Sequence, residues 1–478
     1  MFLGLDLGTS GVKAVLIGDD QTVLATGHAP LSVSNPHPGW SEQTPADWLA
    51  ACRTAIAGLG RRLDRVAGIG LSGQMHGAVC LDADDHVLRP AILWNDGRAH
   101  AEAAVLDADP RFRAITGNIV FAGFTAPKLV WMAKHEPDLF AQTARVLLPK
   151  AYLRLWLTGG HVEDMSDASG TAWFDPATRD WSDDLLTATG MSRAQMPALV
   201  EGSAVSGRLR ADLAAELGLP AGIPVAGGAG DNAATAIAAG IAAPGMGFVS
   251  LGTSGVIFAA TDRFCPAPET AVHAFCHALP GRWHQMGVML SAASSLDWWS
   301  RIVGAKPGDL LAGLGPVAAP GAVRFLPYLS GERTPLNDPA IRGQFIGLAS
   351  SHGRDDLTRA VLEGVSLALA ENLAALKAAG GGADALIAMG GGARSDLWLS
   401  MLAQATGVPV LRPAGAETGG AFGAARLALM AATGAGEEVL TQPPIAAEFS
   451  PDPSLAGTWA EALAALPALR GGTARTAG

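Results

Sequence analysis

The 478-residue sequence has little charge, few cysteines and no run of basic residues. Charged residues make up only 16% of it, and 33 Lys plus Arg against 44 Asp plus Glu leave a formal net charge of -11. An acidic protein without a basic stripe is a poor partner for nucleic acid. The four cysteines include no CxxC pair, which disfavours a disulfide framework and favours a reducing cytosol.

The sequence also shows neither a leader-like start nor an unbroken membrane-spanning pattern. The first residues, MFLGLDLGTSGVK, carry no basic leader and place Asp6 within the apolar stretch. The longest uncharged segment, residues 232–261, exceeds the ~20 residues that cross a bilayer, but Pro244 and several glycines divide it. We therefore expect a cytoplasmic protein without membrane contact, and we interpret this segment as a buried helix, a turn and a hairpin.

The sequence is rich in apolar residues, at 49%, and it contains 60 glycines. This apolar content supports large buried cores, and the glycines indicate many tight backbone turns. At ~100 to 200 residues per domain, the length allows two to four domains. A mainly disordered chain is therefore excluded.

A six-residue string, Leu7–Val12, recurs letter for letter at Leu251–Val256. In both copies an apolar, strand-like run enters the glycine turn and a second run leaves it, which predicts a β-hairpin used twice. Chance recurrence in a glycine-rich chain is the alternative, but the shared setting favours duplication. We predict two domains, each opening on such a hairpin, with a boundary around Pro244.

Strands and helices alternate along both halves of the chain, which predicts an α/β fold. Thr44 followed by proline is typical of a helix start, and residues 125–135 form an expected amphipathic helix with Thr125 as its N-cap. The clearest helix covers residues 355–379, where an apolar stripe ends in three glycines. Residues after Leu469 are small or polar, and we expect a frayed tail there.

Asp6 and the turn that follows it offer groups that bind phosphate. A carboxylate at the end of a strand can hold Mg²⁺ through water, while backbone N–H groups and the hydroxyls of Thr9 and Ser10 suit phosphate oxygens. Lys13 adds a positive charge on the same hairpin. A tight hairpin alone explains the glycines but not a buried aspartate, whose desolvation is costly without a partner. The second copy of the turn would contact the same phosphates from the other domain.

Four small residues, 227–230, precede Asp231 at the start of a predicted helix. An N-cap aspartate is the common explanation for such a position. The small residues favour another, because they clear space beside a carboxylate that must reach a substrate hydroxyl as general base. The glycines at 390–392, after a predicted strand, would let the backbone approach an adenine or a ribose. A tight strand-to-helix turn explains those glycines equally well.

Three other patterns carry less weight. Residues 68–73 match GxGxxG, but strand-like residues follow the third glycine, where a nicotinamide-binding fold requires a helix. No lysine precedes Ser or Thr, so the sequence has no Walker A loop. Four residues suggest a zinc cluster but lack the paired ligand spacing, and we interpret them as ordinary strand residues: His273, Cys276, His277 and His284.

The motifs taken in order resemble the FGGY carbohydrate kinases of the actin and sugar-kinase ATPase superfamily. The resemblance rests on four short motifs, which are Asp6–Ser10, Gly227–Asn232, Ser250–Gly255 and Gly390–Ser395. Two longer strings, Gly123–His135 and Gly343–Glu363, match the signature patterns of that family. Three further segments are similar to those of family members that act on xylulose: Gln74–Gly77, Leu93–Arg98 and Ser330–Pro335.

The resemblance implies two actin-like (ribonuclease H-like) ATPase domains with a central cleft, in which ATP and a sugar meet. Residues 1–242 would form the N-terminal domain, which binds the sugar and carries the first phosphate hairpin. Residues 243–440 would form the nucleotide-binding C-terminal domain, followed by an extension and tail at 441–478.

Site residues follow from the resemblance position by position. Asp231 falls on the catalytic base, Asp6 on the acid that organises Mg²⁺ and the phosphates, and Met75 and His76 on the sugar-binding pair, with Asn232 beside the base. The nucleotide-binding positions are Thr9, Ser10 and Lys13 on the first phosphate hairpin, Gly252 and Thr253 on the second, and Gly391, Gly392 and Ser395 on the adenosine loop. Ala229 departs from the glycine often found in close relatives, and it is expected to narrow the sugar pocket.

The expected reaction is ATP-dependent phosphorylation of D-xylulose to D-xylulose 5-phosphate, with Asp231 as general base and Mg²⁺ as cofactor. Alternatives are a sibling kinase acting on ribulose, another ketose or a polyol, and an actin-like ATPase that needs neither the base nor the sugar pair. A dehydrogenase is disfavoured with the GxGxxG match. The sequence does not set the oligomeric state, for which a homodimer is our working expectation.

Overall fold

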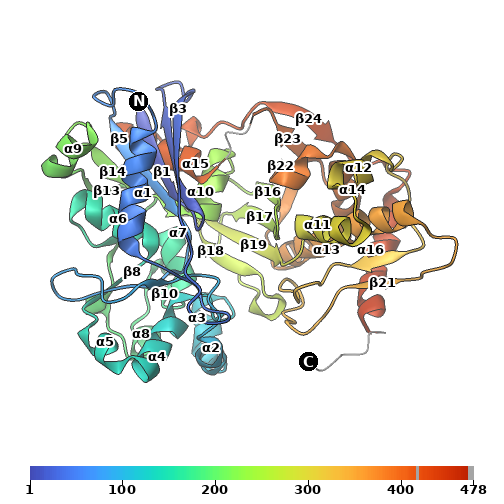
Figure 1. Cartoon of the computed structure of the whole chain (residues 1–478), viewed down its shortest axis with the longest axis horizontal. Coiled ribbons are helices and arrows are strands. Elements are labelled where there is room, and N and C mark those ends of the chain that lie inside the picture. Colours follow the sequence, from blue (N-terminus) through green and yellow to red (C-terminus); the bar gives the residue numbers. More distant parts are fainter. Residues whose placement is uncertain (416–418, 472–478) are drawn as a thin grey trace. The chain divides into compact units, whose positions relative to one another are not determined.

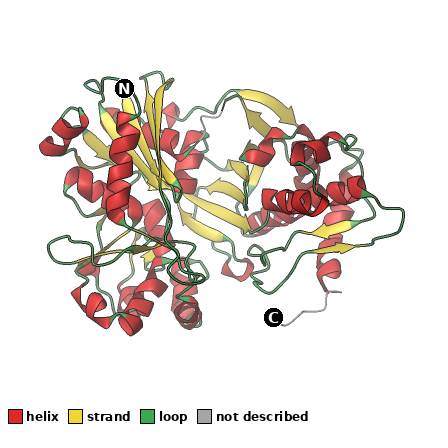
Figure 2. Ribbon diagram, in the orientation of Figure 1, coloured by secondary structure: helices red, strands yellow, loops and turns green. Residues whose placement is uncertain are grey.

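The computed structural model describes residues 1–415 and 419–471, which form two compact units, each built on a mixed sheet (Figures 1 and 2). Unit 1 contains Met1–Ala242, Phe275–Trp283 and the described part of 416–442. Unit 2 contains Ala243–Ala274, His284–Gly415 and the described part of 443–478. The predicted α/β architecture is confirmed, because helices and strands alternate throughout both units.

The sheet of unit 1 has its parallel strands at the centre. Its strand order is β13 (Val205–Arg208), β14 (Pro224–Ala226), β5 (Gly68–Gly73), β1 (Phe2–Leu7), β2 (Gly11–Ile17) and β3 (Val23–Pro30), and the short β15 (Ala229–Gly230) also pairs with β5. β1, β5, β14 and β15 run parallel, whereas β2, β3 and β13 are antiparallel to their neighbours. The carboxyl ends of β1, β5 and β15 therefore meet at one edge, where Leu7 and Gly230 both pair with Gly73.

The second sheet repeats this arrangement around the second copy of the hairpin. Its order is β18 (His273–Cys276), β19 (Trp283–Met289), β17 (Gly255–Thr261), β16 (Gly245–Leu251), β22 (Ala383–Met389), β23 (Val410–Pro413) and β24 (Ile445–Phe449). β16 forms an antiparallel hairpin with β17 and pairs in parallel with β22 on its other side, as β1 does with β2 and β5. The predicted repeat is thus confirmed as the same hairpin in the same place in two sheets.

Helices cover both faces of the sheet in unit 1 (Figure 1). On one face α1 (Pro45–Ala57) buries Trp48, Cys52 and Ile56 against alternate residues of β1, and α6 (Pro149–Thr158) packs beside it. On the other face lies α15 (Gly420–Thr433), whose Ala421 and Ala425 share a cluster with Phe2. Residues of β1 are buried on both faces for this reason, since neighbouring side chains point to opposite faces of the sheet.

Glycines let α15 lie unusually close to the sheet. A Cβ atom on Gly4 would stand 1.9 Å from the carbonyl oxygen of Ala421, and one on Gly70 would stand 1.8 Å from that of Ala424. Gly70 belongs to the GxGxxG match, whose six residues all lie in the buried strand β5. The glycines there make room for a helix. The GxGxxG match is therefore explained by packing and not by a dinucleotide-binding loop.

The helix α15 lies in unit 1, although residues 243–440 were expected to form one C-terminal domain. It packs on β1, on β5 and on α10 (Asp231–Ala238), where Arg426 donates hydrogen bonds to the carbonyl oxygens of Ile237 (3.0 Å) and Ala238 (3.2 Å). A sequence-linear division could not anticipate this, because α15 follows most of unit 2 along the chain.

Unit 2 surrounds its sheet with α11 (Ala293–Val303), α13 (Arg354–Ala378) and α14 (Asp396–Thr406), whose apolar residues form one large cluster with Val249 and Leu251. The C-terminal stretch belongs to this core, since β24 pairs with β23 and α16 (Ala456–Gly471) buries Trp459. The predicted frayed tail begins too early, because Arg470 and Gly471 belong to α16 and Arg470 pairs with Glu371; residues 472–478 lie outside the described residues.

The segment 232–261 forms most of α10 and the β16–β17 hairpin, as interpreted, and no described helix is both long and apolar enough to cross a membrane. The predicted N-cap role of Thr125 is wrong. The helix α4 (Thr125–His135) has the extended residue Phe124 as its N-cap, and the Thr125 hydroxyl donates instead to the carbonyl oxygen of His76 at 3.1 Å.

Candidate functional site

In unit 1 the predicted residues gather at the edge where three parallel strands end. Asp6 is the penultimate residue of β1, and its register partner on β5 is Ser72. Met75 and His76 follow the end of β5, and Asp231 follows β15. Loops beyond the carboxyl ends of parallel strands are the usual location of ligand sites in open α/β sheets.

Asp6 is held in a tightly packed position. Its Oδ1 accepts a hydrogen bond from the Ser72 hydroxyl at 2.8 Å, and Lys13 is its register partner on β2. Burial raises the pKa of Asp6, while the Ser72 bond and the charge of Lys13 oppose that rise. A Cβ on Gly420 would lie 2.9 Å from Oδ1, so α15 closes the far side of the carboxylate. The carboxylate and its serine thus form a fixed oxygen-rich position of the kind that binds hard cations.

Asp231 is the first residue of α10, with Gly230 as N-cap. Its Oδ1 accepts hydrogen bonds from Asn232, from the backbone nitrogen at 2.7 Å and from Nδ2 at 2.9 Å. Burial, reinforced by the negative charge of Asp6, raises the pKa of Asp231 from 3.8 to about 6. The N-cap explanation is therefore wrong for this residue, whose carboxylate bonds to its neighbour and not to the helix N-terminus two or three residues on.

The small residues before Asp231 were expected to clear space beside its carboxylate, but protein atoms fill the space at each of the three glycines. A Cβ on Gly230 would stand 2.8 Å from the Met75 Sδ atom. Gly228 has a positive φ of 75°, and a Cβ there would stand 2.2 Å from the carbonyl oxygen of Leu71. The glycines bring the turn before Asp231 against β5 and against the residues that follow it.

His76 adopts a backbone conformation that is rare for a residue with a side chain. Its φ is +69°, and the Gly77 nitrogen donates to the carbonyl oxygen of Met75 at 2.9 Å, which makes His76 the centre of a γ-turn. The ring Nδ1 lies 2.7 Å from the carbonyl oxygen of Gly170, and the ring stacks on Phe124 with centroids 4.8 Å apart. Both the backbone and the imidazole are therefore fixed before any ligand binds.

The first hairpin turn is bonded to the segment that follows β5. The Thr9 hydroxyl donates to the Gln74 side chain at 2.9 Å and accepts from the indole nitrogen of Trp94 at 3.0 Å. Ser10 is exposed, and its carbonyl oxygen accepts from Leu31. Gln74 and Trp94 were not identified as site residues, although each lies in a segment that resembles the xylulose-acting kinases.

In unit 2 the second hairpin turn and the glycine loop also end neighbouring parallel strands. The carbonyl oxygens of Gly252 and Thr253 accept from the backbone nitrogens of Ala293 (2.8 Å) and Ala292 (3.0 Å), which fixes the turn against the start of α11. The Thr253 side chain is exposed. Gly390 has a φ of 84°, and a Cβ there would stand 2.8 Å from the Leu251 carbonyl, so only glycine fits.

Gly391, Gly392 and Ser395 line a cavity of about 670 Å³ in unit 2, together with Leu296 and Leu311. A cavity of this volume with apolar walls and exposed backbone suits a drug-sized or nucleoside-sized ligand. Ser395 has a structural role that sequence reasoning missed. Its hydroxyl accepts from the Trp398 nitrogen at 3.2 Å and caps α14, which begins at Asp396.

A buried charge cluster lies next to the Asp231 turn. The Lys150 ammonium forms ion pairs with Glu163, Asp164 and Asp167, all fully buried. Asp164 accepts from the Ser166 hydroxyl, which in turn accepts from the Gly230 nitrogen at 3.1 Å. The cluster therefore anchors the residue that precedes Asp231, and its lysine supplies the positive charge that a metal ion would otherwise bring.

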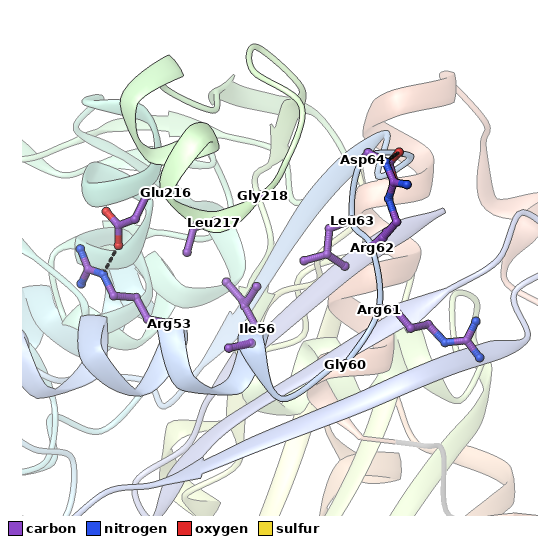
Figure 3. A pocket seen from close by; sticks show the side chains of 11 residues that line it. Arg53, Ile56, Gly60, Arg61, Arg62, Leu63, Asp64, Glu216, Leu217 and Gly218 are labelled. Atoms are coloured by element: carbon purple, nitrogen blue, oxygen red, sulfur yellow. Dashed lines mark hydrogen bonds and ion pairs between the residues drawn. The ribbon is translucent and has the colours of Figure 1, made fainter.

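The described residues contain two groups with metal-like ligand spacing, this cluster and the exposed set Asp82, Asp84 and His86. The four His and Cys residues interpreted as ordinary strand residues belong to neither group. Figure 3 shows a different cavity of about 610 Å³ between the end of α1 and α9 (Ala211–Leu217). Its Arg53 and Arg62 are already paired with Glu216 and Asp64, and no predicted site residue lines it.

Comparison with known proteins decides the family. The model of the N-terminal domain of the FGGY carbohydrate kinases matches residues 1–238, and that of the C-terminal domain matches residues 247–432. The chain belongs to the FGGY family of carbohydrate kinases. Its activity is therefore that of a carbohydrate kinase, and FGGY kinases use ATP.

FGGY proteins of known structure and sequence resemble the chain over nearly its whole length. A xylulose kinase from Escherichia coli (strain K12) is 50% identical over 459 residues, which cover 95% of each chain. The crystal structure of a xyloylose kinase from Brucella ovis superposes with a TM-score of 0.96 at 58% identity, covering 98% of both chains. The xylulose kinase from Rhodospirillum rubrum gives a TM-score of 0.91 at 32% identity over 98% of both. The two-domain mixed α/β fold is thus shared with these kinases.

Proposed function

We propose that the protein phosphorylates D-xylulose with ATP and releases D-xylulose 5-phosphate and ADP. The observation that carries this proposal is the meeting of Asp6, Asp231 and the Met75–His76 pair at one sheet edge, in a chain half identical to the E. coli xylulose kinase. Met75 and His76 would bind the sugar in unit 1. The second phosphate turn and the adenosine loop would be supplied by unit 2.

Asp231 would act as the general base. Its pKa of about 6 leaves the carboxylate ionised near neutral pH and still basic enough to accept a hydroxyl proton. The two bonds from Asn232 to one oxygen orient the carboxyl group and leave Oδ2 for the substrate. As the sugar oxygen attacks the γ-phosphorus of ATP, its proton passes to Asp231 and the bond to ADP breaks.

The residues at Asp6 fit Mg²⁺, because a fixed carboxylate beside a serine hydroxyl presents the oxygen ligands that this ion prefers. Asp6 would hold the ion directly or through water, and the ion would neutralise phosphate charge when bound. Thr9, Ser10 and Lys13 would contact the phosphates from the first hairpin. The remaining nucleotide contacts would come from Gly252, Thr253, Gly391, Gly392 and Ser395.

A substrate panel tests the proposal. ADP release should be fastest with D-xylulose when D-xylulose, D-ribulose, other ketoses and polyols are compared at equal concentration. A clear preference for ribulose or a polyol would change the assigned substrate to that sugar, while the assignment as a sugar kinase would stand. ATP hydrolysis at one rate with or without any sugar would favour an actin-like ATPase.

The role of Asp231 has its own test. Asp231→Asn preserves the two bonds from Asn232 but cannot take a proton, so turnover should fall by ~10²-fold or more. Asp47→Asn removes an exposed first-turn carboxylate from α1 and is the matched control, with turnover unchanged. Near-normal turnover in Asp231→Asn would rule out Asp231 as the general base.

The homodimer stays a prediction, which sedimentation analysis would check.

A further inference from the structure

Lys128 is buried without a carboxylate partner, which is unusual for a lysine. Its side chain is fully buried in α4, and its Nζ donates two hydrogen bonds of 2.8 Å, to the carbonyl oxygens of His76 and Gly123. Among the described residues no carboxylate forms an ion pair with it; Asp96 acts on it only at longer range. A lone buried ammonium is costly, so a purely packing role would be better served by an apolar side chain.

The carbonyl oxygen that Lys128 binds belongs to the strained centre of the γ-turn. His76 holds a positive φ, and its carbonyl oxygen accepts from both Lys128 and Thr125 on the first turn of α4. Left-handed backbone at a residue with a side chain persists only where surrounding contacts over-determine it. The two donors of α4 are such contacts, because they fix the peptide plane that follows His76.

The same segment also fixes the imidazole. The other carbonyl bonded by Lys128, that of Gly123, directly precedes Phe124, whose ring stacks on His76 at an interplanar angle of 23°. The carbonyl oxygen of Gly170 lies 2.7 Å from Nδ1, and a Cβ on Gly170 would stand 2.3 Å from the imidazole Cε1. In the neutral tautomer in which Nδ1 donates to that carbonyl, Nε2 is an acceptor and can receive a hydrogen bond from a sugar hydroxyl.

We propose that Lys128 is a positioning residue for sugar recognition, which holds the His76 and Gly123 carbonyls and thereby keeps the imidazole in its sugar-binding orientation. The proposal rests on the assignment of His76 to sugar binding under the proposed function. It adds a residue that touches neither sugar nor nucleotide in this scheme. Burial lowers the pKa of Lys128 to about 7, and the neutral amine still carries two N–H groups, enough for both carbonyls.

The test compares Lys128→Met with Lys134→Met. Methionine keeps the length of the side chain and tolerates burial but donates nothing, so the dissociation constant for D-xylulose should rise about tenfold, the loss expected for charge-assisted bonds. The dissociation constant for ATP, measured without sugar, should change less than about twofold. Lys134 lies on the same helix but is half exposed and pairs with Glu102, so its variant should leave both constants unchanged.

Each outcome decides the proposal. A folded Lys128→Met protein with unchanged D-xylulose affinity, or with sugar and ATP affinities reduced alike, overturns it. If Lys128→Met gives no cooperative thermal transition, Thr125→Val decides, because it removes the other donor to the His76 carbonyl at nearly constant volume. Weaker sugar binding with normal ATP binding then supports the proposal, and unchanged sugar binding overturns it.

His76→Ala separates this proposal from the function on which it rests. If His76→Ala leaves sugar affinity unchanged, the sugar-binding role of His76 is wrong and the role of Lys128 falls with it. If His76→Ala weakens sugar binding while Lys128→Met does not, only the Lys128 proposal fails. Phosphorylation of a different sugar by the wild type changes the probe and leaves the comparison of variants intact.

Discussion

The raised pKa of Asp231 makes the reaction rate sensitive to acid in a range where an ordinary aspartate would not be. A base must be ionised to accept a proton, so kcat/KM should follow the ionised fraction of Asp231 in the free enzyme. With a pKa of about 6, that fraction falls about elevenfold between pH 8 and pH 5. With the ordinary pKa of 3.8, the ionised fraction would fall by only about 6% over the same pH range.

The raised pKa of Asp231 has two causes, and a variant can separate them. Burial is the larger cause and the charge of Asp6 the second, so Asp6→Asn should move the acid limb of the pH profile to lower pH, even though total activity falls. Quenched assays that quantify ADP directly avoid coupling enzymes with their own pH dependence. The limb position is read from rates relative to the plateau of each variant.

Two results would refute this reasoning. A wild-type kcat/KM that is flat from pH 8 to pH 5 would show that no essential base titrates there. A limb that stays at the same pH in Asp6→Asn but disappears in His76→Gln would assign the titration to the imidazole. Asp47→Asn, which changes the net charge by the same amount at a distant exposed position, should leave the limb unmoved.

Three further outcomes follow from the same packing. The folded state binds the Asp231 proton more tightly than the unfolded chain does, so ionisation of Asp231 destabilises the folded state. Asp231→Asn should therefore raise the free energy of unfolding by up to about 3 kcal/mol at pH 8. That gain should shrink as the pH falls through 6 and vanish below 3.8; urea unfolding of the metal-free protein measures it, and no gain at pH 8 would contradict the shift. Gly420→Ala should lower turnover at least about tenfold, since its Cβ would displace the Ser72 hydroxyl and Asp6, whereas Gly457→Ala, with nothing within 4 Å, should be neutral or stabilising by up to ~1 kcal/mol. Ser166→Ala leaves the Gly230 N–H without its buried partner and should cost about 1 to 3 kcal/mol of stability and part of kcat; unchanged kcat and melting temperature would show that the turn before Asp231 holds itself.

Local patterns in the sequence were sufficient for the elements and for the turns of the site. The repeated Leu7–Val12 string predicts two hairpins because a glycine turn between apolar runs has few other solutions. The helix at 355–379 follows from its apolar stripe and its terminal glycines, and it differs from α13 by one residue at each end. Asp231 was proposed as a base because four small residues precede its carboxylate, although close packing by itself requires the glycines among them.

Contacts between distant segments were beyond such patterns. The Thr125 hydroxyl satisfies every local criterion for an N-cap, yet it donates to the carbonyl oxygen of His76, 49 residues earlier in the chain. Ser395 was assigned to a ligand loop, while its hydroxyl also caps α14. Lys128 lies within the signature string Gly123–His135, but the sequence does not show what it binds, because its partner His76 reaches it only when α4 packs against the turn after β5.

The position of α15 has a consequence for how the protein is made. Synthesis from the N-terminus delivers residues 1–242 first. The glycine-lined face of β1 and β5 stays uncovered until α15 is made, after nearly all of unit 2. Until then Phe2 and Val15 lack their partners Ala421 and Ala425, and the end of α10 lacks Arg426. Unit 1 therefore completes its folding late in translation, after residue 433 has left the ribosome. A fragment ending at residue 242 is an unfinished domain, whereas a circular permutant that begins at 419 would restore its missing layer from the first residues made.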